Sequence, residues 1–165
     1  MIWKSFTLVS VSLFLTCGKA HAQEKCQRLN LVLLIDNDVP TPSDISDCAF
    51  LIKDSVGRIK DSIPFKYEVG GAIMSDSNYN NLFNNAGKYS ISIKFTYFEF
   101  GAGANRTHYY KKEHFSRWLN DWYIILKIYN YSNKESRRKY VIQKDGYVMQ
   151  INSPGGSLIT PIWKK

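Results

Sequence analysis

Beyond its first 22 residues, the sequence lacks the features that mark membrane proteins and several classes of enzyme. It has no further apolar run that could span a bilayer, which takes about 20 residues. Residues 23–165 contain two histidines, two cysteines and no Gly-x-Ser-x-Gly motif, the turn that presents the nucleophile of α/β-hydrolases. The sequence has no internal repeat and no low-complexity linker. We therefore expect a single domain with no transmembrane helix in the mature chain.

The N-terminus has the pattern of a secretory signal peptide. Lys4 supplies a positive charge, and the run from Phe6 to Thr16 is apolar with little interruption. Ala20-His21-Ala22 then places small residues at the −3 and −1 positions of a cleavage site. Residues 1–22 are therefore predicted to be a signal peptide, and residues 23–165 an exported domain that is periplasmic or extracellular.

A lipid anchor is the alternative reading of the same segment. Phe14-Leu15-Thr16-Cys17 is similar to a bacterial lipoprotein cleavage site, with Cys17 as the acylated residue. Thr16 departs from the Gly, Ala or Ser that is usual before the cysteine. The signal-peptide reading is therefore preferred.

Positive charge predominates along the chain. The whole sequence carries a net charge of +8, and removing Lys4 and Lys19 with the signal leaves 20 basic residues against 14 acidic ones, or +6. Such a balance favours anionic partners such as polyanionic glycans, membrane surfaces or nucleic acid. An exported protein rarely meets nucleic acid, so we expect no nucleic-acid partner.

Cys26 and Cys48 are the cysteines that remain after cleavage. In an oxidising compartment an even pair predicts one disulfide. The bond would close a loop of about 22 residues and contribute about 3 kcal/mol in the chain-entropy model. Neither cysteine lies in a setting that activates a nucleophile.

Apolar runs and alternations predict a chain made mostly of strands. In the longest alternation, Tyr89, Ile91, Ile93, Phe95 and Tyr97 share one face. Ser75 or Asp76 could cap a short helix over the polar stretch that follows, although a loop is equally compatible with that stretch. The fold class predicted is an all-β, antiparallel sandwich of seven to nine strands with at most one short helix.

The stretch from Trp122 to Ile151 is expected to form the centre of this fold. Its first run, from Trp122 to Tyr131, is β-branched and aromatic, as in a buried strand. Asp145-Gly146 lies between two alternating runs and is typical of a two-residue hairpin turn. We therefore predict a hairpin at this dipeptide, with Trp122 in the core.

Part of the chain resembles the carboxypeptidase-regulatory-like, transthyretin-like β-sandwich domains of bacterial cell-surface proteins. The matching residues are Gly57-x-Ile59-x-Asp61-x-Ile63-Pro64-Phe65 and Gly87-x-Tyr89-x-Ile91-x-Ile93. An Asn-rich stretch, residues 77–85, replaces the Thr-x-x-x-Gly turn of those domains. The resemblance implies a non-catalytic accessory or binding module, and it brings no catalytic residues with it.

Aromatic and basic side chains gather near one predicted loop and form the candidate ligand site. Flat aromatic faces can stack on sugar rings, and basic side chains can hold anionic groups. The alternative is that these rings fill the core. Trp118 is the residue expected to contact a sugar, if the site exists. The candidate binding residues are Trp118, Tyr109, Tyr110, Lys112 and Arg117, with Lys111 beside them.

Metal and catalytic sites have less support. His108 and His114 would lie about 20 Å apart on one strand, too far to share a metal ion. Asp36 and Asp38 follow a predicted strand and are calcium candidates, but solvated loop carboxylates explain them better. We predict no metal, no cofactor and no catalytic residue.

Three functions remain as hypotheses. The first is an exported, non-catalytic binding or accessory domain whose partner is another envelope protein or a glycan. The second is a carbohydrate-binding module that uses exposed aromatic residues near Trp118. The third is a small hydrolase, which a cleft that brings His108 or His114 to an Asp or Glu side chain would favour.

Overall fold

The computed structural model describes residues 25–101, 105–142 and 146–158. The predicted signal peptide, the alternative anchor at Cys17 and the turn residue Asp145 lie outside these ranges.

The described strands form three open sheets. A small sheet has the order β1 (Cys26–Leu29), β6 (Gly71–Ser75), β5 (Lys66–Glu68). The second, here the β9 sheet, has the order β11 (Gly156–Leu158), β10 (Tyr147–Ser153), β9 (Ile124–Asn130), β2 (Leu31–Ile35). The third, here the β7 sheet, has the order β4 (Ile59–Pro64), β3 (Ile45–Lys53), β7 (Ser90–Glu99), β8 (Arg106–Lys112).

Four helical segments connect these strands. The α-helices are α1 (Asp76–Ala86) and α2 (Lys134–Lys139), and the 3-10 helices are η1 (Pro42–Asp44) and η2 (Phe115–Trp118). The capping hypothesis for α1 is confirmed, because Ser75 is its N-cap and its side chain accepts a hydrogen bond from the backbone N–H of Asn78.

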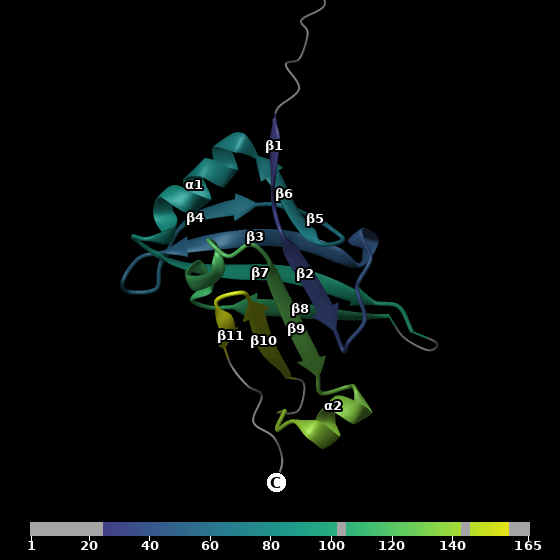
Figure 1. The fold of residues 1–165 in the computed structure, drawn as a ribbon. Coiled ribbons are helices and arrows are strands. Elements are labelled where there is room, and N and C mark those ends of the chain that lie inside the picture. Colours follow the sequence, from purple (N-terminus) through teal and green to yellow (C-terminus); the bar gives the residue numbers. More distant parts are fainter. Residues whose placement is uncertain (1–24, 102–104, 143–145, 159–165) are drawn as a thin grey trace, which may run out of the picture.

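The core lies between the β9 sheet and the β7 sheet, whose strands cross steeply in Figure 1. The small sheet and α1 cover one end of it, and α2 lies at the other end, beyond the end of β9. The core face predicted for β7 is borne out, since Ile91, Ile93 and Phe95 are buried. They pack with apolar side chains of both large sheets, including Phe50, Ile52, Leu31, Leu33, Leu126, Ile128, Met149 and Ile151. Ser92 and Thr96, on the opposite face, are buried as well.

The prediction of a mostly β chain is confirmed, but the predicted arrangement is wrong in three respects. The strands form three sheets, and there are more of them than the seven to nine expected. β2 and β9 pair in parallel, with Leu33 opposite Leu126, so the fold is not purely antiparallel. The described residues form two α-helices, because Asn133 caps a second one by accepting hydrogen bonds from the N–H groups of Glu135 and Ser136.

The hairpin predicted at Asp145-Gly146 falls partly outside the described residues, because the structure does not describe Asp145. β10, which follows Gly146, pairs in an antiparallel ladder with β9, with Tyr147 opposite Asn130. Tyr140, at the start of the segment expected to be the first arm, follows the end of α2, and its ring lies 4.5 Å from that of Tyr129. The turn itself therefore stays a prediction, whereas the pairing of β10 with β9 is established.

The predicted disulfide is absent. Cys26 lies on exposed β1, opposite Ser75, whereas Cys48 is buried on β3 of a different sheet. The thiol of Cys48 donates a hydrogen bond to the backbone carbonyl of Ser46. Burial, with a smaller contribution from the charge of Asp47, raises the pKa of Cys48 to about 12, so this thiol stays protonated near neutral pH.

Candidate functional site

The structure separates the aromatic residues that the sequence placed in one ligand site. Trp118 and Tyr110 are buried, with exposed fractions of 6% and 2%, so neither ring can stack on a ligand at the surface. Trp118 turns inward because η2 packs its ring 6.1 Å from that of Phe115. Tyr109 is 75% exposed. The expectation that Trp122 fills the core is wrong, because its side chain is 88% exposed.

Tyr109 lies on the face of the β7 sheet that is turned away from the core, here called the outer face. Strand register establishes the neighbours of Tyr109 on this face. Tyr109 of β8 is directly opposite Thr96 of β7, and Lys111 is directly opposite Lys94. Directly opposite residues project from the same side of a sheet. A groove of about 330 Å³ is formed there, and its lining includes Tyr109, Thr96, Lys94, Lys111 and Asp47.

The outer face carries more positive than negative charge around the groove. Glu113 accepts hydrogen bonds from Lys53, at 2.7 and 2.8 Å, and from the hydroxyl of Ser92, and it forms an ion pair with Lys111 at 2.7 Å. Asp47 accepts a hydrogen bond from Thr96 at 3.1 Å. Among the described residues, no ion pair engages Lys94. Lys94 is therefore available to an anionic ligand.

The carboxyl of Glu113 is expected to add an acid-sensitive contribution to stability. Partial burial acts to raise its pKa, but the hydrogen bonds from Lys111, Lys53 and Ser92 outweigh it and lower the pKa from 4.5 to about 2. A lowered folded-state pKa stabilises the folded state above the unfolded value, and this contribution is lost as the pH falls from about 4.5 through about 2. Since the side chain is 45% exposed, solvent screens the effect and keeps it small.

Glu113→Gln should therefore remove part of the loss of stability between about pH 4.5 and pH 2. Thermal melting across this range measures it. Glu68→Gln is the control, because Glu68 forms an exposed pair with Lys66 at 3.2 Å. If the melting temperature falls as much between these pH values in Glu113→Gln as in the parent, the prediction is contradicted.

The other predicted basic ligands lie elsewhere. Lys112 is opposite Ile93, so it projects from the core side of β8, and partial burial lowers its pKa. Arg117 is exposed on η2. Of the predicted site residues, Tyr109 and Tyr110 line the groove, with Lys111 beside them, but only the ring of Tyr109 is exposed. Lys94 takes the place expected for Lys112. The alternation of β7 could have indicated Lys94, because it puts Lys94 on the polar face of that strand.

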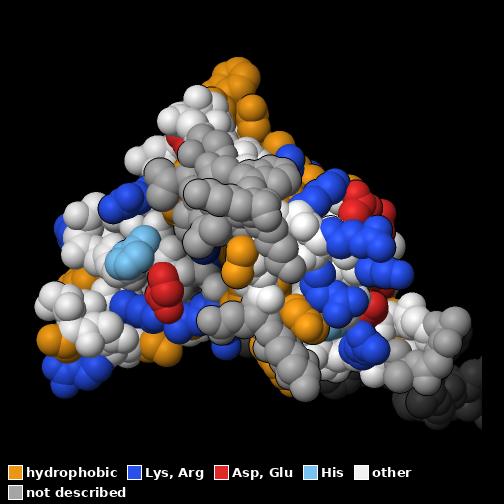
Figure 2. All heavy atoms as spheres, turned by 90° about the horizontal axis from the view of Figure 1, so that it is seen from below, with side chains coloured by type: hydrophobic (Ala, Val, Ile, Leu, Met, Phe, Trp, Pro, Cys, Tyr) orange, Lys and Arg blue, Asp and Glu red, His pale blue; other side chains and the backbone are white. Residues whose placement is uncertain are grey.

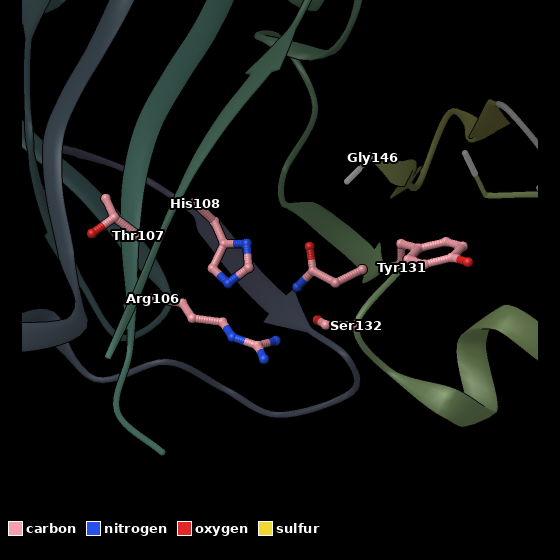
Figure 3. Close-up of a pocket in the computed structure, with 7 residues that line it drawn as sticks. Arg106, Thr107, His108, Tyr131, Ser132 and Gly146 are labelled. Carbon is pink, nitrogen blue, oxygen red and sulfur yellow. The ribbon is translucent and has the colours of Figure 1, made fainter. Parts of the chain in front are cut away.

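A second hollowed region, here called the basin, lies where β2 and β9 end and β8 begins. It consists of two hollows of about 520 and 240 Å³ that share Arg106, Asn130 and Ser132. In Figure 3 the side chains of Arg106 and His108 point from β8 toward the segment that carries Tyr131 and Ser132. The larger hollow is also lined by Thr107 and Gly146, and the smaller one by Ile35, Asp36, Asp38, Tyr97, Glu99 and Asn133.

A buried polar network forms one wall of the basin. Asn130 donates hydrogen bonds from its backbone N–H and its side-chain amide to Asp36, both at 3.0 Å, and accepts one from the hydroxyl of Tyr110 at 2.7 Å. Ser136 donates a further hydrogen bond to Asp36 at 3.2 Å. Asp36 and Asn37 both have positive φ, 51° and 75°, in a two-residue turn that Ile35 and Asp38 close. The carboxylate of Asp36 is thus used within the protein.

The structure brings His108 to an acidic side chain in a hollow, which is the arrangement that the hydrolase hypothesis requires. Nε2 of His108 lies 2.8 Å from Oε2 of Glu99. The ring of His108 stacks against those of Tyr97 and Tyr110, with centroid distances of 5.9 and 6.0 Å. The partner of His114 is instead a serine, with Nδ1 3.3 Å from the hydroxyl of Ser90. A serine triad needs one histidine that contacts both a serine and an acid. Among the described residues, His108 has the acid as its hydrogen-bond partner and His114 has the serine.

The described ranges contain no group of three or more His, Cys, Asp and Glu side chains that could hold a metal ion. No helix within those ranges is long and apolar enough to cross a membrane. On the face seen in Figure 2, Lys and Arg side chains outnumber Asp and Glu.

Comparison with known proteins does not identify a relative. No family model matches the chain, and neither a curated protein nor a solved structure matches it. The outer-face groove and the basin are therefore the features that bear on function.

Proposed function

We propose that this protein is an exported, non-catalytic binding domain that holds an acidic polysaccharide in the groove on the outer face of the β7 sheet. One observation carries the proposal: the ring of Tyr109, 75% exposed, lies on the same sheet face as Lys94 and Lys111, beside a groove of about 330 Å³. Such a surface combines a stacking platform with cations that can pair with carboxylate or sulfate groups.

The floor of the groove leaves room for a sugar ring. Thr96, opposite Tyr109, is a small side chain with an exposed fraction of 3%. Because Thr96 is small, the ring of Tyr109 has open space beside it on the neighbouring strand. The hydroxyl of Thr96 is already bonded to Asp47, which holds that carboxylate at the edge of the groove.

The backbone beneath Tyr109 is held in place. The hydroxyl of Tyr147, on β10, lies 3.0 Å from the backbone N–H of Lys111 and 3.1 Å from its carbonyl oxygen. This single side chain thus pairs with both backbone polar groups of Lys111 and ties the edge of β8 to the β9 sheet. A rigid platform loses little conformational entropy when a ligand binds.

Tyr109→Ala should weaken binding of polygalacturonate or a sulfated glycan by a factor of about two to ten, since an aromatic stacking contact contributes about 0.5–1.5 kcal/mol. Lys94→Gln should weaken it less and should also reduce its dependence on salt concentration. Isothermal titration calorimetry on the mature protein measures both, with thermal melting to confirm that each variant is folded.

Trp122→Ala and Tyr123→Ala are the matched controls, because these side chains are 88% and 44% exposed on a different segment. Both variants should bind the acidic glycan as the parent does. Loss of binding in Trp122→Ala with none in Tyr109→Ala would overturn the proposed location. Binding to neutral dextran as tight as to the acidic glycan would overturn the proposed ligand class. The absence of binding to any glycan would favour an envelope protein as the partner.

A further inference from the structure

We propose that the basin is a second binding site, separate from the outer-face groove, and that its ligand is a free α-amino acid. Arg106 would bind the carboxylate of this ligand and Asp38 its ammonium group. The side chain of the amino acid would extend into the larger hollow.

Arg106 is a cation without an ion pair inside the described part of the chain. It stands directly opposite Glu99 in the register of β7 and β8, which is the usual position for a cross-strand ion pair. The carboxylate of Glu99 is instead bonded to His108, at 2.8 Å. Arg106 therefore lines both hollows with its guanidinium available, as Figure 3 shows for the larger one. A guanidinium of this kind binds carboxylates through two parallel hydrogen bonds.

Asp38 is the matching anion in the smaller hollow. It follows the turn at Asp36 and Asn37, and its backbone is bonded to Ile35 in both directions, at 2.9 and 3.0 Å. Over the described ranges, its carboxylate forms neither an ion pair nor a hydrogen bond. The neighbouring carboxylate of Asp36 is occupied by Asn130 and Ser136. Asp38 is thus the acid of this hollow that remains available to a ligand.

The charges of the basin favour a zwitterion over a simple ion. A purely anionic ligand would meet Asp36, Asp38 and Glu99, whereas a purely cationic one would meet Arg106. A ligand with both charges can pair each with its opposite. The smaller hollow, of about 240 Å³, would take the charged groups. The larger one, of about 520 Å³, would take the side chain beside His108 and Tyr131.

Calorimetric titration of the mature protein with the common free L-amino acids tests the proposal. The amino acid that binds best is then compared with its N-acetyl derivative and with its C-terminal amide. Each derivative removes one of the two charges, so each should bind at least about tenfold more weakly. Arg106→Gln should weaken binding of the free amino acid but leave binding of the amide unchanged. Asp38→Asn should weaken binding of the free amino acid but leave binding of the N-acetyl derivative unchanged.

Arg117→Gln is the control variant, because Arg117 is exposed on η2 and lines neither hollow. It should bind the free amino acid as the parent does. Failure of every free amino acid to bind would overturn the proposal. So would equal affinity for the free amino acid and both derivatives, or tighter binding of inorganic phosphate or glucose. All of these outcomes are measured on the parent protein, so they test the proposal even if a substitution disturbs the fold.

Discussion

Replacing Asn130 with alanine is expected to lower the free energy of unfolding by about 3 kcal/mol, because it leaves two polar groups without their partner. The side chain of Asn130 accepts a hydrogen bond from the hydroxyl of Tyr110 at 2.7 Å and donates one to Asp36 at 3.0 Å. Tyr110 is 2% exposed, so in the parent protein its hydroxyl depends on Asn130 for an acceptor. Burial also raises the pKa of Tyr110, so its hydroxyl keeps its proton and still needs an acceptor.

Equilibrium denaturation in urea measures the effect of Asn130→Ala. Asn120→Ala is the control, because Asn120 is exposed, and it should change the free energy of unfolding by less than about 0.5 kcal/mol. A loss below about 1 kcal/mol for Asn130→Ala would contradict the prediction, since it would mean that the basin wall relaxes around the missing amide.

Phe50→Ala is expected to have a still larger effect, a loss of about 4 kcal/mol, since truncating a buried phenylalanine costs both its transfer free energy and the cavity left behind. Phe50 is fully buried on β3. Its ring centroid lies 4.7 Å from that of Phe65 and 5.8 Å from that of Phe115. It thus joins the β7 sheet to η2 and to the segment between β4 and β5, and its loss weakens all of these contacts.

The control for Phe50→Ala is Phe100→Ala, because Phe100 is 68% exposed just after the end of β7. This variant should unfold at nearly the parent denaturant concentration, within about 0.5 kcal/mol in free energy. If the two variants were equally stable, the core could not be organised around Phe50 as described.

Local sequence patterns predicted the elements that local physics determines. The alternation from Ile91 to Phe95 predicted a strand with an apolar face in the core, because side chains project to opposite faces of a strand at every second residue. Ser75 was one of two residues proposed to cap a helix there, with a loop as the alternative, and it is the N-cap of α1 because its hydroxyl accepts a hydrogen bond from an N–H group that the first turn of a helix leaves free. In both cases the residues that are recognisable in the sequence are the same residues that form the stabilising contact in the structure.

The exposure of the candidate ligand residues depended on more distant contacts. Trp118 and Trp122 are four residues apart in one aromatic segment, yet Trp118 is buried and Trp122 is 88% exposed. Two contacts account for the difference: η2 turns Trp118 toward Phe115, and the side chain of Asn30 holds the backbone carbonyl of Trp122 at 2.9 Å. Asn30 lies 92 residues away in sequence, so local composition contains no sign of it.

The sequence by itself determined that the chain is mostly β and where its longest strand runs, and it narrowed the start of a possible helix to Ser75 or Asp76. Tertiary structure alone decided the parallel pairing of β2 with β9, the separation of Cys26 from Cys48, and the basin built around Asn130. The physical reason is the range of the interactions. Strand alternation and helix capping involve residues a few positions apart, whereas the bond from Asn130 to Asp36 joins residues 94 positions apart and exists only once β2 and β9 lie side by side.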